Sequence, residues 1–306
     1  MALSKRGVLV LIAAAIVVLL AGWRALSHPR PSATVVDYPR LAPGVIMRDV
    51  TFHSQALQRD MQYRAFLPEN PGKQKLAVVY LLHGGGGTFR DWSNYSNVAQ
   101  FAAGERMLVM PQGDYSYYTN FALRPQERYE DYIVNDLPGD VEARFPARTD
   151  RGGRAIVGNS MGGFGAVKLA LRHPEKYGFV GALSAAIDVS RRPFSWKRLS
   201  QSRAYREMFG PDGSDSRRNN DPFVLVRTAD SPNTPYLYMT CGRQESLLAP
   251  NREFSALLTR YHIRHEFHEV PGGHDWNQWN TQLPALFESL RSSSATSAVF
   301  NTTSSH

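Results

Sequence analysis

Cysteine is nearly missing from this chain: Cys241 is the only one among 306 residues. A single cysteine excludes an intramolecular disulfide, so an exported domain of this sequence would rest on its hydrophobic core alone. Because Cys241 ends an apolar run, its position favours a small buried residue over a reactive thiol. There is no internal repeat, and the 42% of hydrophobic residues is enough for one large α/β domain.

The sequence also lacks motifs for nucleic-acid binding. Its formal net charge of +8 could suggest such a partner, but the basic residues do not form one run. His262, His265 and His268 are three residues apart, as metal ligands on a helix would be. The surrounding residues alternate like a strand, however, which places His265 on the face opposite the other two histidines. We therefore expect no nucleic acid, no metal and no organic cofactor.

Charged residues are missing from positions 7–23, directly after Lys5 and Arg6. As a helix, this segment would span about 25 Å, slightly less than the ~30 Å hydrocarbon core of a bilayer. Residues 1–23 are interpreted as a signal peptide or a signal-anchor helix, and the poor cleavage site favours the anchor. Because Lys5 and Arg6 should remain cytoplasmic, we expect an extracytoplasmic domain, periplasmic or at the cell surface, that is anchored or, after cleavage, secreted.

Three segments follow the hydrophobic one. Residues 24–43 contain several prolines and predict a stiff tether to the membrane. Residues 44–291 are the expected catalytic domain. From residue 76 onward, strand-like and helix-like runs alternate, which predicts an α/β domain with a mostly parallel sheet and helices on both faces. Antiparallel edge strands are expected near the start of this domain, at residues 45–53 and 61–67. Residues 292–306 are polar and of low complexity, which predicts a disordered tail.

The most informative motif of the sequence is Gly158-Asn159-Ser160-Met161-Gly162, a serine flanked by glycines. An apolar run precedes it and a helical pattern follows, so Ser160 falls on a sharp turn between a strand and a helix. A serine there exposes its hydroxyl above a helix N-terminus, and the glycines on both sides avoid clashes within the turn. This context predicts a nucleophilic serine; an ordinary glycine-rich turn is the alternative.

A nucleophilic serine needs a base and an acid that orients the base. In this type of fold the acid and then the histidine follow the serine along the chain, each on a loop after a strand. His274 lies on a glycine-rich loop after the last predicted strand and is the expected base; a surface histidine that caps the last helix is the alternative. Glu245, just past the penultimate strand, is the expected acid, and Asp188 and Asp275 are its rivals.

The negative charge of the reaction intermediate needs backbone N–H donors. An apolar run over residues 76–82 predicts a central strand, and His83 with four glycines follows it. Such a loop can approach a reacting carbonyl closely, so the expected oxyanion donors are the amides of Gly85 and Met161. The glycine run lacks the ending of a phosphate-binding loop and the spacing of a dinucleotide fingerprint, which argues against a nucleotide site.

Several short motifs occur together in this sequence: residues 83–87, Asp91-Trp92, residues 129–132, residues 158–163, residues 172–175, Cys241-Gly242 and residues 273–276. Through these motifs the sequence resembles the esterase D family over roughly residues 45–290. Relatives in this family include S-formylglutathione hydrolases, tributyrin, feruloyl and siderophore esterases, and bacterial mycolyltransferases. The resemblance implies an α/β-hydrolase fold, a triad of Ser160, Glu245 and His274, and Gly85 and Met161 as oxyanion donors. Many esterases of the family have aspartate in place of Glu245, whereas the mycolyltransferases use glutamate.

Residues 188–222 lie between two predicted strands at a point where hydrolases of this fold often insert a lid. Aromatic and basic residues alternate there, so Trp196 could cover an acyl pocket, or the segment could meet an anionic substrate or headgroup. A solvated lid is the alternative. Tyr115 and Tyr117, on a loop after a strand, and Trp276, near the expected base, are further expected substrate contacts, with simple packing as the alternative.

Together these patterns predict a serine esterase that hydrolyses carboxylic esters through an acyl-enzyme on Ser160. The expected partners are a small-molecule, lipid or glycan ester and, through the N-terminal segment, the membrane. The chief alternative is an extracytoplasmic acyltransferase that uses the same triad to move an acyl group onto an envelope glycan or lipid. A non-catalytic binding protein is disfavoured, because every catalytic group is present. The acyl group, the alcohol and the oligomeric state stay open.

Overall fold

The computed structural model describes residues 36–102, 104 and 106–303, with side chains up to residue 293. The chain divides into two units, Met1–Tyr38 and Pro39–His306. The predicted signal or anchor segment and most of the predicted tether lie outside the described residues. Within the part of the chain that the structure describes, no helix is both long and apolar enough to cross a bilayer.

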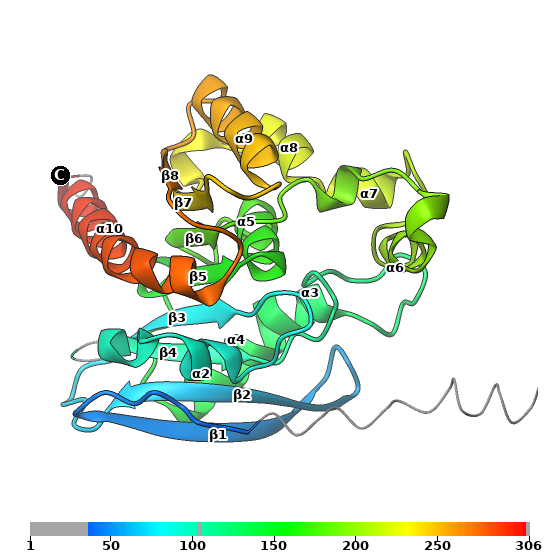
Figure 1. Ribbon diagram of the computed structural model, residues 1–306. Helices are drawn as coiled ribbons and strands as arrows, with labels where there is room; N and C mark the ends of the chain where they lie inside the picture. The colour runs from blue at the N-terminus through cyan, green and yellow to red at the C-terminus, as the bar shows by residue number, and fades with distance from the viewer. Residues whose placement is uncertain (1–35, 103, 105, 304–306) are drawn as a thin grey trace, which may run out of the picture. The chain divides into compact units, whose positions relative to one another are not determined.

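The second unit is built on an eight-stranded sheet with the order β1-β2-β4-β3-β5-β6-β7-β8 (Figure 1). Strand β2 pairs antiparallel with both β1 and β4, whereas all other neighbours run parallel. Two antiparallel strands therefore open a mostly parallel sheet, as the sequence predicts. The strands are β1 (Val45–Ser54), β2 (Arg59–Pro68), β3 (Ala77–Leu82), β4 (Arg106–Pro111), β5 (Arg154–Asn159), β6 (Phe179–Leu183), β7 (Tyr236–Gly242) and β8 (His265–Val270).

Helices cover both faces of this sheet, which confirms the predicted α/β-hydrolase architecture. Buried residues of α4, α5 and α9 join the hydrophobic cluster on one face, and those of α2 and α10 join the cluster on the other. Because both faces are covered, the central strands are buried and carry continuous apolar runs rather than an alternating pattern. The helices are α2 (Asp91–Tyr95), α3 (Tyr129–Asp131), α4 (Leu137–Arg144), α5 (Met161–Arg172), α6 (Leu199–Phe209), α7 (Asp215–Asn219), α8 (Pro222–Leu225), α9 (Leu248–Arg260) and α10 (Trp276–Thr303).

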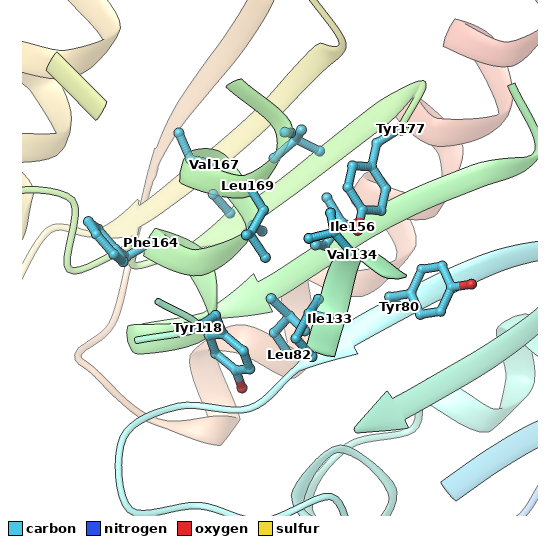
Figure 2. Packing of buried hydrophobic residues seen from close by; sticks show 14 of the residues in the cluster. Tyr80, Leu82, Tyr118, Ile133, Val134, Ile156, Phe164, Val167, Leu169 and Tyr177 are labelled. Atoms are coloured by element: carbon cyan, nitrogen blue, oxygen red, sulfur yellow. The ribbon is translucent and has the colours of Figure 1, made fainter. Parts of the chain in front are cut away.

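The core between α5 and the sheet fixes the start of that helix. Figure 2 shows Leu82 of β3 and Ile156 of β5 in one cluster with Val167 and Leu169 of α5, and all four side chains are fully buried. A Cβ at Gly162, in the first turn of α5, would collide with the backbone carbonyl of Leu82. Only a glycine lets the helix approach this closely, so the N-terminus of α5 is held against the carboxyl ends of the central strands.

The segment between β6 and β7 forms the insertion that the sequence predicts at residues 188–222, and it contains α6, α7 and α8. Helix α6 is attached to the loop that precedes α3, beside which it lies in Figure 1. The N–H groups of Ala122 and Leu123 each donate to a carbonyl at the end of α6, at 3.0 Å. The insertion is therefore tied to the rest of the domain by backbone hydrogen bonds.

Helix α10 continues to Thr303, whereas the sequence predicts a disordered tail from residue 292. The two descriptions differ over residues 292–303. The physical reason is that this segment, although polar, contains no glycine or proline that would end a helix already formed by the residues before it.

Candidate active site

Ser160 lies at the turn between β5 and α5, where its backbone takes φ 53° and ψ −114°. A residue other than glycine is strained in this region, and such strain gathers at functional sites. Two glycines make the turn possible, because a Cβ on Gly158 would collide with the backbone of Gly162. The turn holds the Ser160 side chain at the N-terminus of α5, at the carboxyl edge of the sheet.

Three side chains from separate elements meet at this edge. His274 Nε2 lies 2.8 Å from Ser160 Oγ, and His274 Nδ1 lies 2.6 Å from Glu245 Oε2. A carboxylate only accepts, so Nδ1 donates to Glu245 and leaves Nε2 free to accept the Ser160 hydroxyl proton. Glu245 follows β7 and His274 follows β8. The Glu245 side chain is 1% exposed and that of His274 is 39% exposed, so the pair is open to solvent on the histidine side.

The Glu245 carboxylate is surrounded by hydrogen-bond donors. Burial alone would raise the pKa of Glu245, but hydrogen bonds from His274, Ser184 and the N–H of Gly242 outweigh it and lower the pKa. Ser184 Oγ donates to Glu245 Oε1 at 2.6 Å, and the Gly242 N–H donates to the same oxygen at 2.8 Å. Every one of these bonds favours the charged form. The group that faces His274 is therefore a carboxylate able to stabilise an imidazolium.

Ser184 is a site residue that the sequence analysis missed. It directly follows β6 and has a positive φ of 48°. Its hydroxyl donates to Glu245 and accepts a hydrogen bond from Trp279 Nε1 at 3.0 Å. The Trp279 ring also meets the His274 ring edge to face, with centroids 5.0 Å apart. Trp279 thus contacts the histidine directly and the carboxylate through Ser184.

Trp279 belongs to a row of three rings that we call the tryptophan wall (Trp92, Trp276 and Trp279). Trp276 packs edge to face against Trp92 at 5.1 Å and against Trp279 at 5.2 Å. The indole N–H of Trp92 donates to the carbonyl of Leu82 at 3.1 Å. Trp276, one of the predicted substrate contacts, is therefore a partly buried member of a packed aromatic row beside His274.

The glycine loop after β3 lies next to Ser160. A Cβ on Gly84 would be 3.5 Å from Ser160 Cβ, and one on Gly85 would be 3.9 Å from Met161 Cβ. Met161 is the first residue of α5, so its N–H belongs to the free amides of a helix N-terminus. The structure thus brings together Ser160 and both residues whose amides the sequence predicts as oxyanion donors.

His83, at the start of this loop, is fully buried and holds it from within. Its Nε2 lies 2.9 Å from the backbone nitrogen of Gly113 and must accept that N–H, so Nδ1 carries the proton and donates to the carbonyl of Gly84 at 2.8 Å. Burial lowers the pKa of His83, against the opposing effect of the Gly84 carbonyl. The loop is therefore supported by a neutral histidine, a role that the sequence analysis did not assign.

Both rival acids are engaged elsewhere. Asp188 forms an ion pair with Arg192 at 2.8 Å. Asp275 accepts a hydrogen bond from the N–H of Gln278 at 3.0 Å, at the start of α10. Among the described residues, no group of three or more histidine, cysteine, aspartate or glutamate side chains could hold a metal ion.

The remaining predicted substrate contacts lie at two separate places. Tyr115 and Tyr117 belong, with Tyr205 of α6, to a group that we call the tyrosine cluster. The Tyr115 ring is 43% exposed and lies against the glycine loop, 3.1 Å from where a Cβ on Gly85 would be. Tyr117 is buried behind it, with its hydroxyl 3.3 Å from that of Tyr205. Trp196 is 81% exposed, and its ring packs against Phe194 at 5.2 Å.

Comparison with known proteins agrees with this geometry. Residues 54–290 match a family model described as putative esterase. An acetyl esterase from Caldicellulosiruptor saccharolyticus is 28% identical over 255 residues, which cover 78% of this chain and 96% of that protein. Esterase Rv1288 from Mycobacterium tuberculosis is 32% identical over 226 residues, which cover 64% of this chain and 48% of that protein. The structure of FphF, a fluorophosphonate-binding serine hydrolase of Staphylococcus aureus, has a TM-score of 0.69 and 24% identity over 82% of this chain and 98% of that chain, a likeness that shows the fold.

Proposed function

Because the chain belongs to the putative esterase family and is a serine esterase, we propose that Ser160, His274 and Glu245 are its catalytic triad and that esters of short acyl groups are its substrates. The observation that carries the proposal is the hydrogen-bonded line from Ser160 through His274 to the buried carboxylate, at 2.8 and 2.6 Å. This line begins at a strained turn, beside the free amides of a helix N-terminus.

In the first half of the reaction, Ser160 Oγ attacks the carbonyl carbon of the ester while His274 Nε2 takes the hydroxyl proton. The charge that develops on the carbonyl oxygen faces the N–H groups of Gly85 and Met161, and each such donor contributes about 3 kcal/mol. The bond to the alcohol oxygen then breaks, and His274 gives the proton to that oxygen. Glu245 holds the imidazole in the required tautomer and stabilises its charged form.

In the second half, water attacks the carbonyl carbon of the acyl-enzyme on Ser160. His274 takes one proton from this water and returns it to Ser160 Oγ when the acyl bond breaks. The products are one alcohol and one carboxylic acid, and the residues return to their starting protonation states. The exposed side of His274 gives water a direct path to the base.

A short acyl group, acetate first, is supported by the packing beyond the glycine loop. Tyr115 lies against Gly85, and the ring of Tyr117 behind it meets those of Phe164 and Phe209 edge to face at 5.6 and 5.8 Å. We propose that these packed rings limit the length of acyl chain that fits beside the glycine loop. The acetyl esterase relative, whose length this chain almost fully spans, supports the same substrate class.

The test is a series of p-nitrophenyl esters from acetate to decanoate, with Ser160→Ala alongside the wild type. We expect the highest kcat/KM with acetate, a decline with longer chains and loss of hydrolysis in the variant. A fluorophosphonate probe should label the wild type and leave Ser160→Ala unlabelled. Hydrolysis that survives the substitution would contradict the triad, and an optimum at decanoate would contradict the short acyl group.

Acyl transfer with the same triad is a second candidate, because 39% exposure of His274 admits an alcohol acceptor as well as water. It predicts that added glycan or glycerol acceptors form new esters in competition with hydrolysis.

We also propose that the domain works outside the cytoplasm, attached to the membrane by residues 7–23 or released from it. The proposal is supported by the uncharged segment after Lys5 and Arg6. The test is a fusion, after residue 306, of a reporter enzyme that folds into its active form only outside the cytoplasm. We expect this reporter to be active.

A further inference from the structure

Backbone strain in this protein gathers around the active site. Among the described residues, seven other than glycine have a positive φ, and three of them lie on the loop after β4: Asp114 at 45°, Tyr117 at 50° and Tyr118 at 54°. Ser160 and Ser184 are two more. Such residues cost of order 1–3 kcal/mol each and persist only where the surrounding structure enforces them. Three of the strained residues therefore lie on one loop, the loop after β4.

This loop is fixed at its base and exposed at Tyr115. The Tyr118 hydroxyl donates to the carbonyl of His83 at 2.9 Å, and Lys168 Nζ donates to the carbonyl of Tyr118 at 2.7 Å. Gly165 of α5 makes room for the Tyr118 ring, because a Cβ there would lie 2.5 Å from it. Tyr118 is fully buried, whereas Tyr115 is 43% exposed. The loop is therefore a rigid support that presents Tyr115 to solvent.

Hydroxyl groups gather behind Tyr115. The hydroxyls of Tyr117 and Tyr205 are 3.3 Å apart, and Gln201 Nε2 donates to the Tyr205 hydroxyl at 2.9 Å. Tyr117 and Tyr205 are buried, whereas Tyr115 is 43% exposed. A phenol can both donate and accept a hydrogen bond, so the exposed tyrosine of this group is the one that a ligand oxygen can reach.

The inserted helix supplies half of this arrangement. Gln201 and Tyr205 both lie on α6, which is tied by backbone hydrogen bonds to the loop before α3. The exposed end of the cluster lies against Gly85, on the loop that faces the nucleophile. Tyr115, whose ring packs on Tyr117 and through it on Tyr205 of the insertion, thus stands next to the loop that lies beside Ser160.

We propose that Tyr115 determines specificity by hydrogen bonding an oxygen of the substrate outside the ester group, and that α6 positions it through Tyr205 and Tyr117. This inference deepens the proposed function and rests on it. The preferred ester then carries hydroxyl or ether oxygens close to the ester bond, as the acetyl ester of a sugar does and that of a plain alkanol does not. A phenol suits such a ligand, because sugar hydroxyls also donate and accept.

The test compares two acetyl esters of similar size on the full-length protein: glucose 6-acetate, which carries hydroxyls, and cyclohexylmethyl acetate, which does not. Released acetate is measured, and the quantity of interest is the ratio of the two kcat/KM values. The wild type should favour the sugar ester, and Tyr115→Phe should reduce the ratio about 5-fold, within the range of one neutral hydrogen bond. The change should appear in KM for the sugar ester, since the bond forms on binding.

Tyr236→Phe is the matched control, because it removes the hydroxyl of a partly buried tyrosine at the start of β7 and should leave the ratio unchanged. If Tyr115→Phe lowers kcat/KM equally for both esters, or changes it for neither, the inference is overturned while the proposed esterase activity stands. A wild type that hydrolyses neither ester and does not react with a fluorophosphonate probe would overturn the proposed function as well.

Discussion

The two sides of the active site use aromatic residues in different ways. On the tryptophan wall, the indole N–H groups of Trp92 and Trp279 are both taken up by protein acceptors, Leu82 and Ser184. In the tyrosine cluster, Tyr117 and Tyr205 are buried, whereas Tyr115 is 43% exposed. An N–H group that is already bonded to a protein acceptor can only position other groups. An exposed tyrosine, in contrast, can form a hydrogen bond with a ligand. We therefore expect the tryptophan side to support the chemistry and the tyrosine side to contact the substrate.

The substitution with the greatest expected effect is at Glu245, on the tryptophan side. Glu245→Gln should lower kcat about 10⁴-fold with p-nitrophenyl acetate, because an amide no longer fixes the reactive tautomer or stabilises the imidazolium. KM and the ratio between sugar and alkyl esters should stay as in the wild type. Glu245→Asp, which keeps the charge on a shorter side chain, is the control and should retain more activity. A variant with glutamine that keeps a tenth of the wild-type kcat would remove Glu245 from the triad.

The next largest effect concerns the support beneath the tyrosine cluster. Buried Glu130 binds Lys168, Arg172 and His173 at 2.7–2.8 Å, and Lys168 also holds the carbonyl of Tyr118. Lys168→Met leaves this carboxylate without its buried partner and should lower the free energy of unfolding by about 3–5 kcal/mol. Urea unfolding measures the loss. Lys73→Met, at an exposed position, should change it by less than about 0.5 kcal/mol.

The same ion pair predicts a pH dependence of stability. Burial would raise the pKa of Glu130, but Lys168, His173 and Arg172 outweigh it and hold the pKa far below its ordinary value. A carboxyl whose pKa is depressed in the folded state stabilises the fold above its unfolded pKa, about 4.3, and loses that contribution as the pH falls. The wild type should therefore lose stability between about pH 5 and pH 3, and Lys168→Met should show a shallower slope over this interval. Equal slopes would contradict this assignment.

A smaller loss of activity is expected from a substitution at Trp279. Trp279→Phe keeps an aromatic ring against His274 but removes the hydrogen bond to Ser184, and should lower kcat about 5-fold. The preference between sugar and alkyl esters should not change, because the tryptophan wall does not contact the discriminating oxygen. Ser184→Ala removes this bond and also the hydrogen bond to Glu245, so it should lower kcat further than Trp279→Phe does. A shift of the preference in either variant would show that the two sides do not act separately.

The smallest expected effect belongs to the inserted helix. Tyr205→Phe removes one hydroxyl from behind Tyr115 and should lower the ratio of sugar to alkyl ester by about 2-fold, since Tyr115 itself remains. This decrease is measured from the same two kcat/KM values, for glucose 6-acetate and for cyclohexylmethyl acetate. An effect larger than that of Tyr115→Phe would mean that Tyr205, rather than Tyr115, meets the ligand.

Much of the fold, and the fact that Ser160, Glu245 and His274 lie close together, could be predicted from the sequence because both follow from local patterns. An apolar strand, a glycine-flanked serine and a helix specify the turn at Ser160, and loops after strands place Glu245 and His274 at one edge of the sheet. The catalytic roles of these residues stay predictions until activity is measured. Ser184 could not be found, since a serine after a strand carries no distinctive pattern. The meeting of Tyr117 and Tyr205, which are 88 residues apart, depends on how α6 packs.

The neutral histidine in the glycine loop has a consequence for kinetics. Both ring nitrogens of His83 are bonded to backbone groups, and burial lowers its pKa, so the loop keeps one charge state from mildly acidic to alkaline solution. Protonation of His83 should therefore not contribute to the dependence of the rate on pH. In a magnetic resonance titration over this interval, the ring signals of His83 should stay in place.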